Sequence, residues 1–364
     1  MSKGIIVVKI GSAVLSTACG MLDSKQIKSF ARQVFVLKEA GYSVVVISSG
    51  AVAAGISALG LSLRPKQLAQ LQATAAVGQS RLMHSYEDAF KKYGVVTAQV
   101  LLTQDDFSER KRFINAKNTL SALINDYKVV PIINENDTIA TEEIKFGDND
   151  RLSSLVATAV SASTLVILTD VDGLYDPSNK KVISLVSRID NYIKGISKPT
   201  GNKFGKGGMA SKLEAASVMM QSGITCIIAN GRTKNILLNI EQQKYVGTTF
   251  VPFADKAKAR KSWLAFAPKS KGALVLDEGA KVAVVSSGRS LLAAGIKSVS
   301  GIFEAGDVVE IKDIDGNRIA RGVVNFSVQE LRNIKGLKSG EIPKVIKRSS
   351  KHNEVVHRDN LVLI

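Results

Sequence analysis

The sequence predicts an α/β protein whose open, mainly parallel β-sheet is sandwiched by helices, followed by a small β-rich pseudo-barrel domain. In the first two-thirds of the chain, short runs of β-branched residues alternate with longer amphipathic segments, a pattern typical of parallel strands joined by helices. After the basic stretch Lys256 to Lys261 the segments become short and are punctuated by glycine. With 364 residues the chain is long enough for two cores. We therefore predict domains at residues 1–268 and 269–364.

The elements of the first domain follow from their residues in chain order. Ile5 to Ile10 is apolar except for Lys9, and Val44 to Ile47 is wholly β-branched, so both are predicted as buried strands. Between them, apolar residues at helical spacing predict a helix that is capped by Ser24 and ends at Gly41. The same patterns predict further helices at about 66–93, 115–126, 150–161 and 209–221, and further strands at about 95–102, 128–133, 164–168 and 224–229.

The second domain is predicted from shorter segments. Ala267 to Gly272 combines proline, lysine, serine and glycine, which is typical of a linker. Beyond it, four Val- and Ile-rich segments predict strands: Ala273 to Leu276, Val282 to Val285, Val308 to Ile311, and Ile319 to Val324.

Composition excludes several classes of protein. No apolar run approaches the roughly 20 residues of a membrane span, and the N-terminal apolar stretch is too short for a signal peptide. We therefore expect a cytoplasmic protein without a membrane partner. Two cysteines, Cys19 and Cys226, imply no disulfide framework. The three histidines stand outside the acidic region at 131–150, which disfavours a histidine triad or a histidine-bound zinc, and we expect no protein-bound metal.

The net charge of +17 raises the alternative of a nucleic-acid-binding protein. The charge has nearly the same density in both predicted domains, however. An even distribution is more typical of a solvated surface, or of a funnel for anionic substrates, than of one nucleic-acid face.

Two acid and amide clusters flank one short segment and are the strongest sign of a site. The first is Asn134-Glu135-Asn136-Asp137 at the end of an apolar strand, and the second is Gly147-Asp148-Asn149-Asp150. Asp and Asn are poor residues for strand and helix interiors, so they belong in a loop and at a helix cap. In an open α/β sheet, ligands bind at this edge. Either cluster alone is also compatible with ordinary turns and caps.

Four more segments reach the predicted edge. Lys9 interrupts an apolar strand before Gly11, and we interpret it as a cation held at the ligand edge, where the glycine lets the backbone approach a phosphate. A lysine snorkelling to solvent at the strand's end is the alternative. Ser48 to Gly55 offers free N–H groups where a strand enters a helix. Leu168 to Tyr175 carries Thr169, Asp170 and Asp172, although an ordinary Asp-Gly turn accounts for it too. Gly205 to Lys212 places glycines and two lysines before a helix, without P-loop spacing.

Lysines, glycine-rich backbone and clustered carboxylates together suit phosphoryl transfer, where catalysis consists of positioning and charge neutralisation. An acceptor carboxylate with a pKa of about 4.3 is already a nucleophile at neutral pH and needs no general base. The absence of histidine from these motifs fits that chemistry.

These motifs resemble the amino acid kinase family along essentially the whole chain. The matching motifs are, in order, V-K-I-G-S, S-S-G-A-V-A-A-G, A-V-G-Q-S-R-L, N-E-N-D, K-F-G-D-N-D, L-T-D-V-D-G-L-Y, G-K-G-G-M-A-S-K and K-S-V-S-G. N-E-N-D followed by G-D-N-D is specific to members that act on glutamate. The resemblance implies ATP-dependent phosphorylation of the side-chain carboxylate of L-glutamate, giving γ-glutamyl phosphate, the first step of proline synthesis.

The resemblance also implies roles for individual residues. Lys9 and Lys212 would neutralise the migrating phosphoryl group from opposite sides, and Asp150 would hold both lysines. Glutamate would be bound by Ser49, Gly50, Asn134, Asp137, Asp148 and Asn149. The nucleotide would be lined by Lys9, Thr169, Asp170, Lys206, Gly207, Gly208, Met209, Ala210, Ser211 and Lys212, with Mg²⁺ bridging its phosphates. Lys206 and Ser211 replace threonines that are usual in the family, and Lys206 adds a cation beside the phosphates.

The C-terminal domain resembles a PUA domain, with its best match at Ser286 to Ile296. That resemblance implies a role in oligomer organisation or regulation and raises RNA as a partner. The domain has few aromatic residues, Phe303 and Phe326 among them, which disfavours base stacking. The family implies a dimer or tetramer and feedback inhibition by proline.

Two alternatives stay open at the level of sequence. One is an RNA-binding or RNA-modifying protein. The other is a sibling kinase that acts on aspartate, N-acetylglutamate or uridylate.

Overall fold

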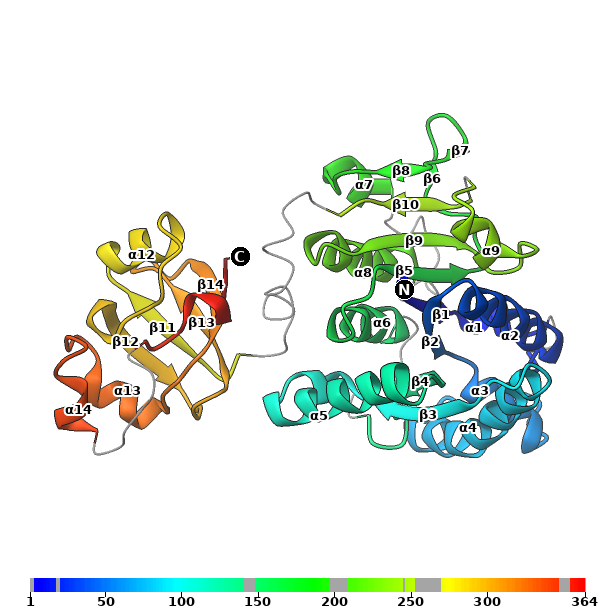
Figure 1. Ribbon diagram of the computed structural model, residues 1–364, viewed down its shortest axis with the longest axis horizontal. Helices are drawn as coiled ribbons and strands as arrows, with labels where there is room; N and C mark the ends of the chain where they lie inside the picture. Colours follow the sequence, from blue (N-terminus) through cyan, green and yellow to red (C-terminus); the bar gives the residue numbers. More distant parts are fainter. Residues whose placement is uncertain are drawn as a thin grey trace. The chain divides into compact units, whose positions relative to one another are not determined.

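The computed structural model describes residues 3–17, 20–140, 148–196, 208–244, 246–252, 270–346 and 354–363. The chain divides into two compact units, the first holding strands β1 to β10 and the second strands β11 to β15 (Figure 1). The predicted boundary at residues 268 and 269, and the first half of the predicted linker, lie outside the described residues, so that boundary stays a prediction.

The first unit contains a single large sheet of eight strands. Its order is β3-β4-β2-β1-β5-β9-β10-β8, with β10 antiparallel to β9 and the other pairs parallel. This confirms the predicted open, mainly parallel sheet. The strands are β1 (Gly4–Ile10), β2 (Tyr42–Ser48), β3 (Thr97–Leu102), β4 (Val130–Glu135), β5 (Thr164–Thr169), β8 (Leu185–Val186), β9 (Thr225–Asn230) and β10 (Thr248–Phe250), and β6 (Tyr175–Asp176) pairs separately with β7 (Lys181–Val182).

Helices cover both faces of this sheet, as predicted. The helices in this part of the chain are α1 (Ser12–Leu15), α2 (Ser24–Glu39), α3 (Ala51–Ala58), α4 (Leu68–Lys91), α5 (Arg110–Ser121), α6 (Asp148–Ala159), α7 (Asn191–Ile196), α8 (Met209–Gln221) and α9 (Ile236–Glu241), with shorter turns η1 (Gln104–Phe107) and η2 (Ala122–Asp126). Asp105–Ile114, which include most of η1 and the start of α5, belong to the second compact unit. Side chains alternate along a strand. Ile6, Val8 and Ile10 pack into the core with α2, α4 and α9, so Lys9 projects to the other face, where α6 and α8 lie.

Two glycines let α3 and α4 touch backbone to backbone. A Cβ atom on Gly55 would stand 1.9 Å from the carbonyl oxygen of Thr74, and one on Gly78 would stand 1.8 Å from that of Ala51. No side chain fits at either position. The crossing brings the start of α3, directly after Ser49 and Gly50, against the middle of α4.

The helix after β1 is capped differently from the prediction. The side chain of Asp23 accepts hydrogen bonds from the backbone N–H groups of Lys25 and Gln26, so Asp23 is the N-cap and Ser24 is the first helical residue. Asp and Ser are both strong caps, and the two adjacent candidates in the sequence led to an error of one residue. Gly41 has a φ of 93°, which is the left-handed conformation expected just past a helix end.

The second unit contains a five-stranded sheet in the order β12-β11-β13-β14-β15. Its elements are β11 (Gly272–Leu276), α12 (Glu278–Val285), η3 (Ala293–Gly295), β12 (Ile296–Gly301), β13 (Val308–Lys312), β14 (Arg318–Val323), α13 (Val328–Ile334), α14 (Ile342–Val345), η4 (Arg358–Asn360) and β15 (Leu361–Leu363). The strands predicted at 273–276, 308–311 and 319–324 are confirmed. Phe303 and Phe326 are each 1% exposed within the core, so neither is available to stack on a base.

The strand predicted at Val282 to Val285 is wrong, because these residues end helix α12. The side chain of Asp277 accepts a hydrogen bond from the N–H of Ala280 and caps the helix. Val284 is buried while Val282 and Val285 are exposed. One turn of an amphipathic helix with three valines cannot be told from a strand by composition.

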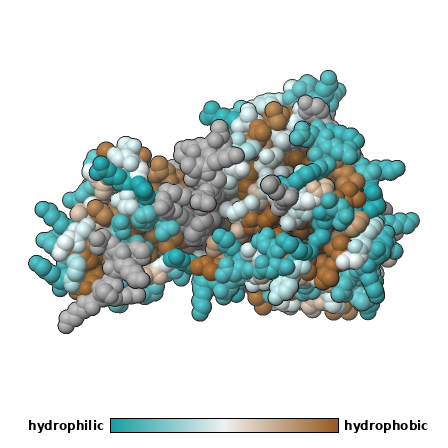
Figure 2. Space-filling view, in the orientation of Figure 1, coloured by the Kyte–Doolittle hydropathy of each residue, from teal (hydrophilic) through white to brown (hydrophobic). Residues whose placement is uncertain are grey.

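Figure 2 shows hydrophobic residues in separate patches among hydrophilic ones on the face of each unit in view. Among the described residues, no helix is both long and apolar enough to cross a membrane.

Candidate functional site

One buried carboxylate joins two lysines at the carboxyl edge of the sheet. Asp150 lies in the first turn of α6, and its side chain is fully buried. Its Oδ1 is 2.6 Å from the Nζ of Lys9, and its Oδ2 is 3.2 Å from the Nζ of Lys212. Lys9 comes from the end of β1 and Lys212 from the first turn of α8. The structure thus brings together all three predicted catalytic residues.

The charges in this cluster depend on one another. Burial, the largest influence, disfavours the ionised form of Asp150, but Lys9, Lys212 and a hydrogen bond from Ser211 outweigh it and hold the pKa of Asp150 below its usual range. Burial also lowers the pKa of Lys9; Asp150 opposes this shift and Lys212 adds to it. Two lysines share one carboxylate, so Asp150 alone does not balance the charge of both ammonium groups.

The N-terminus of α8 adds donors to this positive charge. The hydroxyl of Ser211 donates to Oδ2 of Asp150 at 2.8 Å. Gly208 is the N-cap of α8 and provides no side-chain cap, so the N–H groups of the first turn, which includes Met209 and Ala210, have no capping side chain. A helix N-terminus of this kind favours anions. Lys206 and Gly207, also predicted here, lie outside the described residues.

Polar side chains from three elements meet beside the lysines. The Nδ2 of Asn149, in α6, donates to the hydroxyl of Ser49 at 2.9 Å and to the Oδ1 of Asn134 at 3.1 Å. Gly50 follows with a φ of 113°, the conformation that glycine favours, and forms the N-cap of α3. Ser49 is also joined to β1, because its N–H donates to the carbonyl of Ile10. The predicted glutamate-binding residues Ser49, Asn134 and Asn149 are therefore in direct contact.

Asp137 lies farther along the segment that follows β4. Its carboxylate is close enough to the guanidinium of Arg64 for the two charges to interact. The carbonyl of Ala140, at the end of the same segment, accepts a hydrogen bond from Gln72 of α4. The segment is thereby held against α4. The side chain of Asp148, predicted to bind in the same place, lies outside the described residues.

Thr169 is the last residue of β5, the strand next to β1, and Asp170 follows it directly. The hydroxyl of Thr169 donates to Oδ1 of Asp170 at 3.0 Å, and the charge of Asp170 acts on Lys9. Gly11 donates its N–H to the carbonyl of Leu168, and a Cβ atom there would stand 3.1 Å from that oxygen. The predicted nucleotide residues of β5 thus adjoin the lysine cluster. The described residues hold no group of three His, Cys, Asp or Glu side chains suited to a metal ion.

Two contacts in this region were not expected from the sequence. The Oε1 of Gln79 accepts a hydrogen bond from the Nδ2 of Asn134 at 2.8 Å, and Arg64 approaches Asp137. Gln79 lies within the motif A-V-G-Q-S-R-L, but a glutamine in a long amphipathic helix carries no signal that distinguishes it from a solvated residue.

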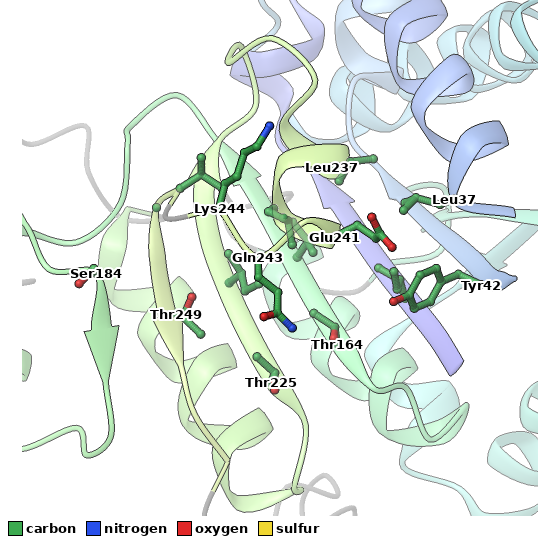
Figure 3. Close-up of a pocket in the computed structure, with 16 residues that line it drawn as sticks. Leu37, Tyr42, Thr164, Ser184, Thr225, Leu237, Glu241, Gln243, Lys244 and Thr249 are labelled. Atoms are coloured by element: carbon green, nitrogen blue, oxygen red, sulfur yellow. The ribbon is translucent and has the colours of Figure 1, made fainter. Parts of the chain in front are cut away.

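A separate pocket lies away from these residues (Figure 3). It has a volume of about 380 Å³ and lies over β1, β5 and β9, with Leu37, Leu237 and Glu241 on the side of α2 and α9. Its strand residues include Ile6 and Thr164, at the beginnings of their strands, whereas the lysine cluster lies at the carboxyl ends. None of the predicted site residues lines it.

Comparisons with known proteins show which families the two parts of the chain match. Residues 4–230 match the amino acid kinase family, and residues 272–346 match the PUA domain. A glutamate 5-kinase from Caldanaerobacter subterraneus subsp. tengcongensis is 44% identical over 364 residues, which cover 99% of this chain and 97% of that protein. Glutamate 5-kinases from Geobacter sp. strain M21 and Marinomonas sp. strain MWYL1 are 45% and 44% identical, with the same coverage.

Proposed function

Because this chain belongs to the amino acid kinase family, we propose that it transfers the γ-phosphoryl group of ATP to the side-chain carboxylate of L-glutamate, giving γ-glutamyl phosphate and ADP. In proline synthesis this is the first step. The observation that carries the proposal is the bridge from Lys9 to Lys212 through Asp150, at an edge that also holds an anion-binding helix N-terminus.

The chain's own residues stabilise the charge that moves during transfer. Asp150 fixes the two ammonium groups through opposite oxygens of one carboxylate, so their positions need no rearrangement as charge develops. The N–H groups at the start of α8 add to the same positive field. The acceptor carboxylate is ionised at neutral pH and attacks directly, so no general base is required.

We propose that Mg²⁺ binds together with ATP. The described residues provide no three-ligand acidic cluster, so the ion would be held chiefly by the phosphates of the nucleotide, with Asp170 as the exposed carboxylate beside Lys9. Bound there, the ion would neutralise charge on the phosphate oxygens.

A panel of acceptors tests the substrate. ADP release should be measured with ATP and Mg²⁺ in the presence of glutamate, aspartate, N-acetylglutamate or uridylate, with hydroxylamine added to trap an acyl phosphate. We expect hydroxamate formation with glutamate alone. Preference for another acceptor would identify a sibling kinase, and inactivity with all four would reject the proposal.

Asp137→Ala should mainly raise the KM for glutamate. A hydrogen bond to a charged group contributes about 1.5–3 kcal/mol, which corresponds to a rise of roughly tenfold to hundredfold. The kcat and the KM for ATP should change little, because Asp137 lies beyond the lysine cluster. Steady-state kinetics of Asp137→Ala should be compared with those of Arg64→Ala, to tell whether Asp137 contacts glutamate directly. If Arg64→Ala raises the KM for glutamate by the same factor, Asp137 acts only through Arg64.

The pH dependence of kcat should reveal the pKa of the Lys9 ammonium group. Its pKa lies below the usual 10.5, so activity should fall as pH rises through that lowered value and the ammonium loses its charge. In Lys9→Arg the guanidinium stays charged to a much higher pH than the ammonium of Lys9, because arginine is not deprotonated in proteins. The basic limb of a normalised kcat profile should therefore move to higher pH in this variant. An unmoved limb would assign it to another group.

RNA binding by the second unit, a homo-oligomeric state and inhibition by proline remain predictions from the family, and a cytoplasmic location remains a prediction from composition. Salt-sensitive retention of RNA on a filter would support the first of these.

A further inference from the structure

Four polar side chains form a continuous hydrogen-bonded row beside the lysine cluster. The row runs from Gln79 of α4 through Asn134 at the end of β4 and Asn149 of α6 to the hydroxyl of Ser49. Three of the four belong to the proposed glutamate site. Gln79 is the member whose role is unassigned.

Two backbone groups determine which way each carboxamide in the row points. The N–H of Glu135 donates to Asn134 at 2.9 Å, so the atom it meets must be the oxygen Oδ1. The carbonyl of Ser48 can only accept, so the Asn149 atom that approaches it at 3.3 Å must be Nδ2. Because Oδ1 of Asn134 faces Glu135, its Nδ2 faces Gln79 and requires the Oε1 of Gln79 as acceptor.

With the carboxamides in these orientations, one donor and one acceptor of the row remain unpaired. The Nε2 of Gln79 and the Oδ1 of Asn149 are both buried, and neither has a hydrogen-bond partner among the described residues. A buried polar atom without a partner costs about 1–3 kcal/mol, so two in one row point to a ligand that satisfies both. A group that combines an anionic acceptor with a cationic donor would do so, and the α-carboxylate and α-ammonium of an amino acid are such a group.

The position of Gln79 indicates which carboxylate of the substrate it meets. Lys9 and Lys212 meet on the face of the sheet covered by α6 and α8, where the reacting carboxylate must lie. Gln79 belongs to α4, which packs with α2 on the opposite face. The Gln79 end of the row is thus the end remote from phosphoryl transfer.

We propose that Gln79 is a substrate-binding residue whose Nε2 donates to the α-carboxylate of the amino acid, while the Oδ1 of Asn149 accepts from the α-ammonium. This inference rests on the proposed function, because it takes the substrate to be an α-amino acid. It makes Gln79 a determinant of specificity for a free α-carboxylate.

Gln79→Glu is the sharpest test, because it removes only the donor. The new carboxylate still accepts from Asn134, but it presents a negative oxygen to the α-carboxylate. We expect kcat/KM for glutamate to fall about 100-fold, while the KM for ATP is unchanged. With the α-amide of glutamate, whose carboxamide can donate to the new carboxylate, kcat/KM should instead rise. A purely structural role would change both substrates by the same factor and would overturn the inference.

Control experiments distinguish a failure of this inference from misfolding of the variant and from a failure of the proposed function. Gln70→Glu adds the same charge at an exposed position of α4. This variant should leave both kcat/KM for glutamate and the KM for ATP unchanged. If Gln79→Glu does not fold, Gln79→Met is tested in its place. A rise of about tenfold in the KM for glutamate, with no increase in kcat/KM for the α-amide, supports the inference. A wild-type KM for glutamate overturns it. A wild-type protein inactive on glutamate would reject the proposed function itself.

Discussion

Replacing Lys212 by alanine is expected to lower kcat by about two to three orders of magnitude, the usual loss when one preorganised donor to a transition state is removed. The KM for glutamate should stay close to the wild-type value, because the polar row from Gln79 to Ser49 does not include Lys212. Asp150 would keep Lys9 at 2.6 Å and the hydroxyl of Ser211 at 2.8 Å. The fold should therefore survive the substitution.

The measurement is steady-state kinetics of ADP release together with thermal unfolding. Lys91→Ala, which removes a lysine from an exposed helix end, is the matched control for the loss of one positive charge and should retain wild-type kcat. Lys9→Ala should resemble Lys212→Ala, and the double variant should lose far less than the product of the two, since the pair acts as a unit. A Lys212→Ala enzyme within about threefold of wild-type kcat would contradict the mechanism.

Asp150→Ala should have a different signature, because it leaves two buried ammonium groups without their shared counterion. Breaking a buried ion pair in this way costs about 3–5 kcal/mol of stability. The comparison therefore separates residues that contact the migrating phosphoryl group from the residue that positions them.

The predictable part of this molecule is the part in which local pattern and tertiary structure agree. Lys9 stands out because one charge interrupts an apolar strand. The alternation of side chains along a strand then places Lys9 on the other face of the sheet from Ile6 and Val8. The acid and amide clusters stand out because their residues disfavour strands. In both cases the misfit with secondary structure is the signal.

The parts that sequence could not supply depend on partners from distant elements. Gln79 is an ordinary helical residue until Asn134 meets it from β4, 55 positions away. The error at Val282 to Val285 has a local origin instead: those valines suit a strand, but the side chain of Asp277, a few residues earlier, caps a helix that includes them. Which carboxylate oxygen each lysine contacts is, by contrast, a property of the assembled edge.

The second large effect is expected at Gly78, where Gly78→Ala should destabilise the first unit by about 3 kcal/mol or more, at or beyond the upper end of ordinary overpacking. The added methyl group would stand 1.8 Å from the carbonyl oxygen of Ala51 and 2.4 Å from the backbone nitrogen of Gly55. Both obstacles are backbone atoms of α3. No change of rotamer relieves the overlap, so the two helices must move apart.

That separation should also reach the substrate, because α3 begins directly after Ser49 and Gly50 while Gln79 follows Gly78. Moving α3 away from α4 would pull the two ends of the polar row in opposite directions, so the KM for glutamate should rise as the protein is destabilised. Chemical denaturation and kinetics below the new melting temperature measure the two effects. Gly195→Ala is the matched control: a Cβ atom there has no neighbour within 4 Å, and in α7 the change should be neutral or slightly stabilising. A Gly78→Ala protein as stable as wild type would show that α3 and α4 approach less closely than their glycines indicate.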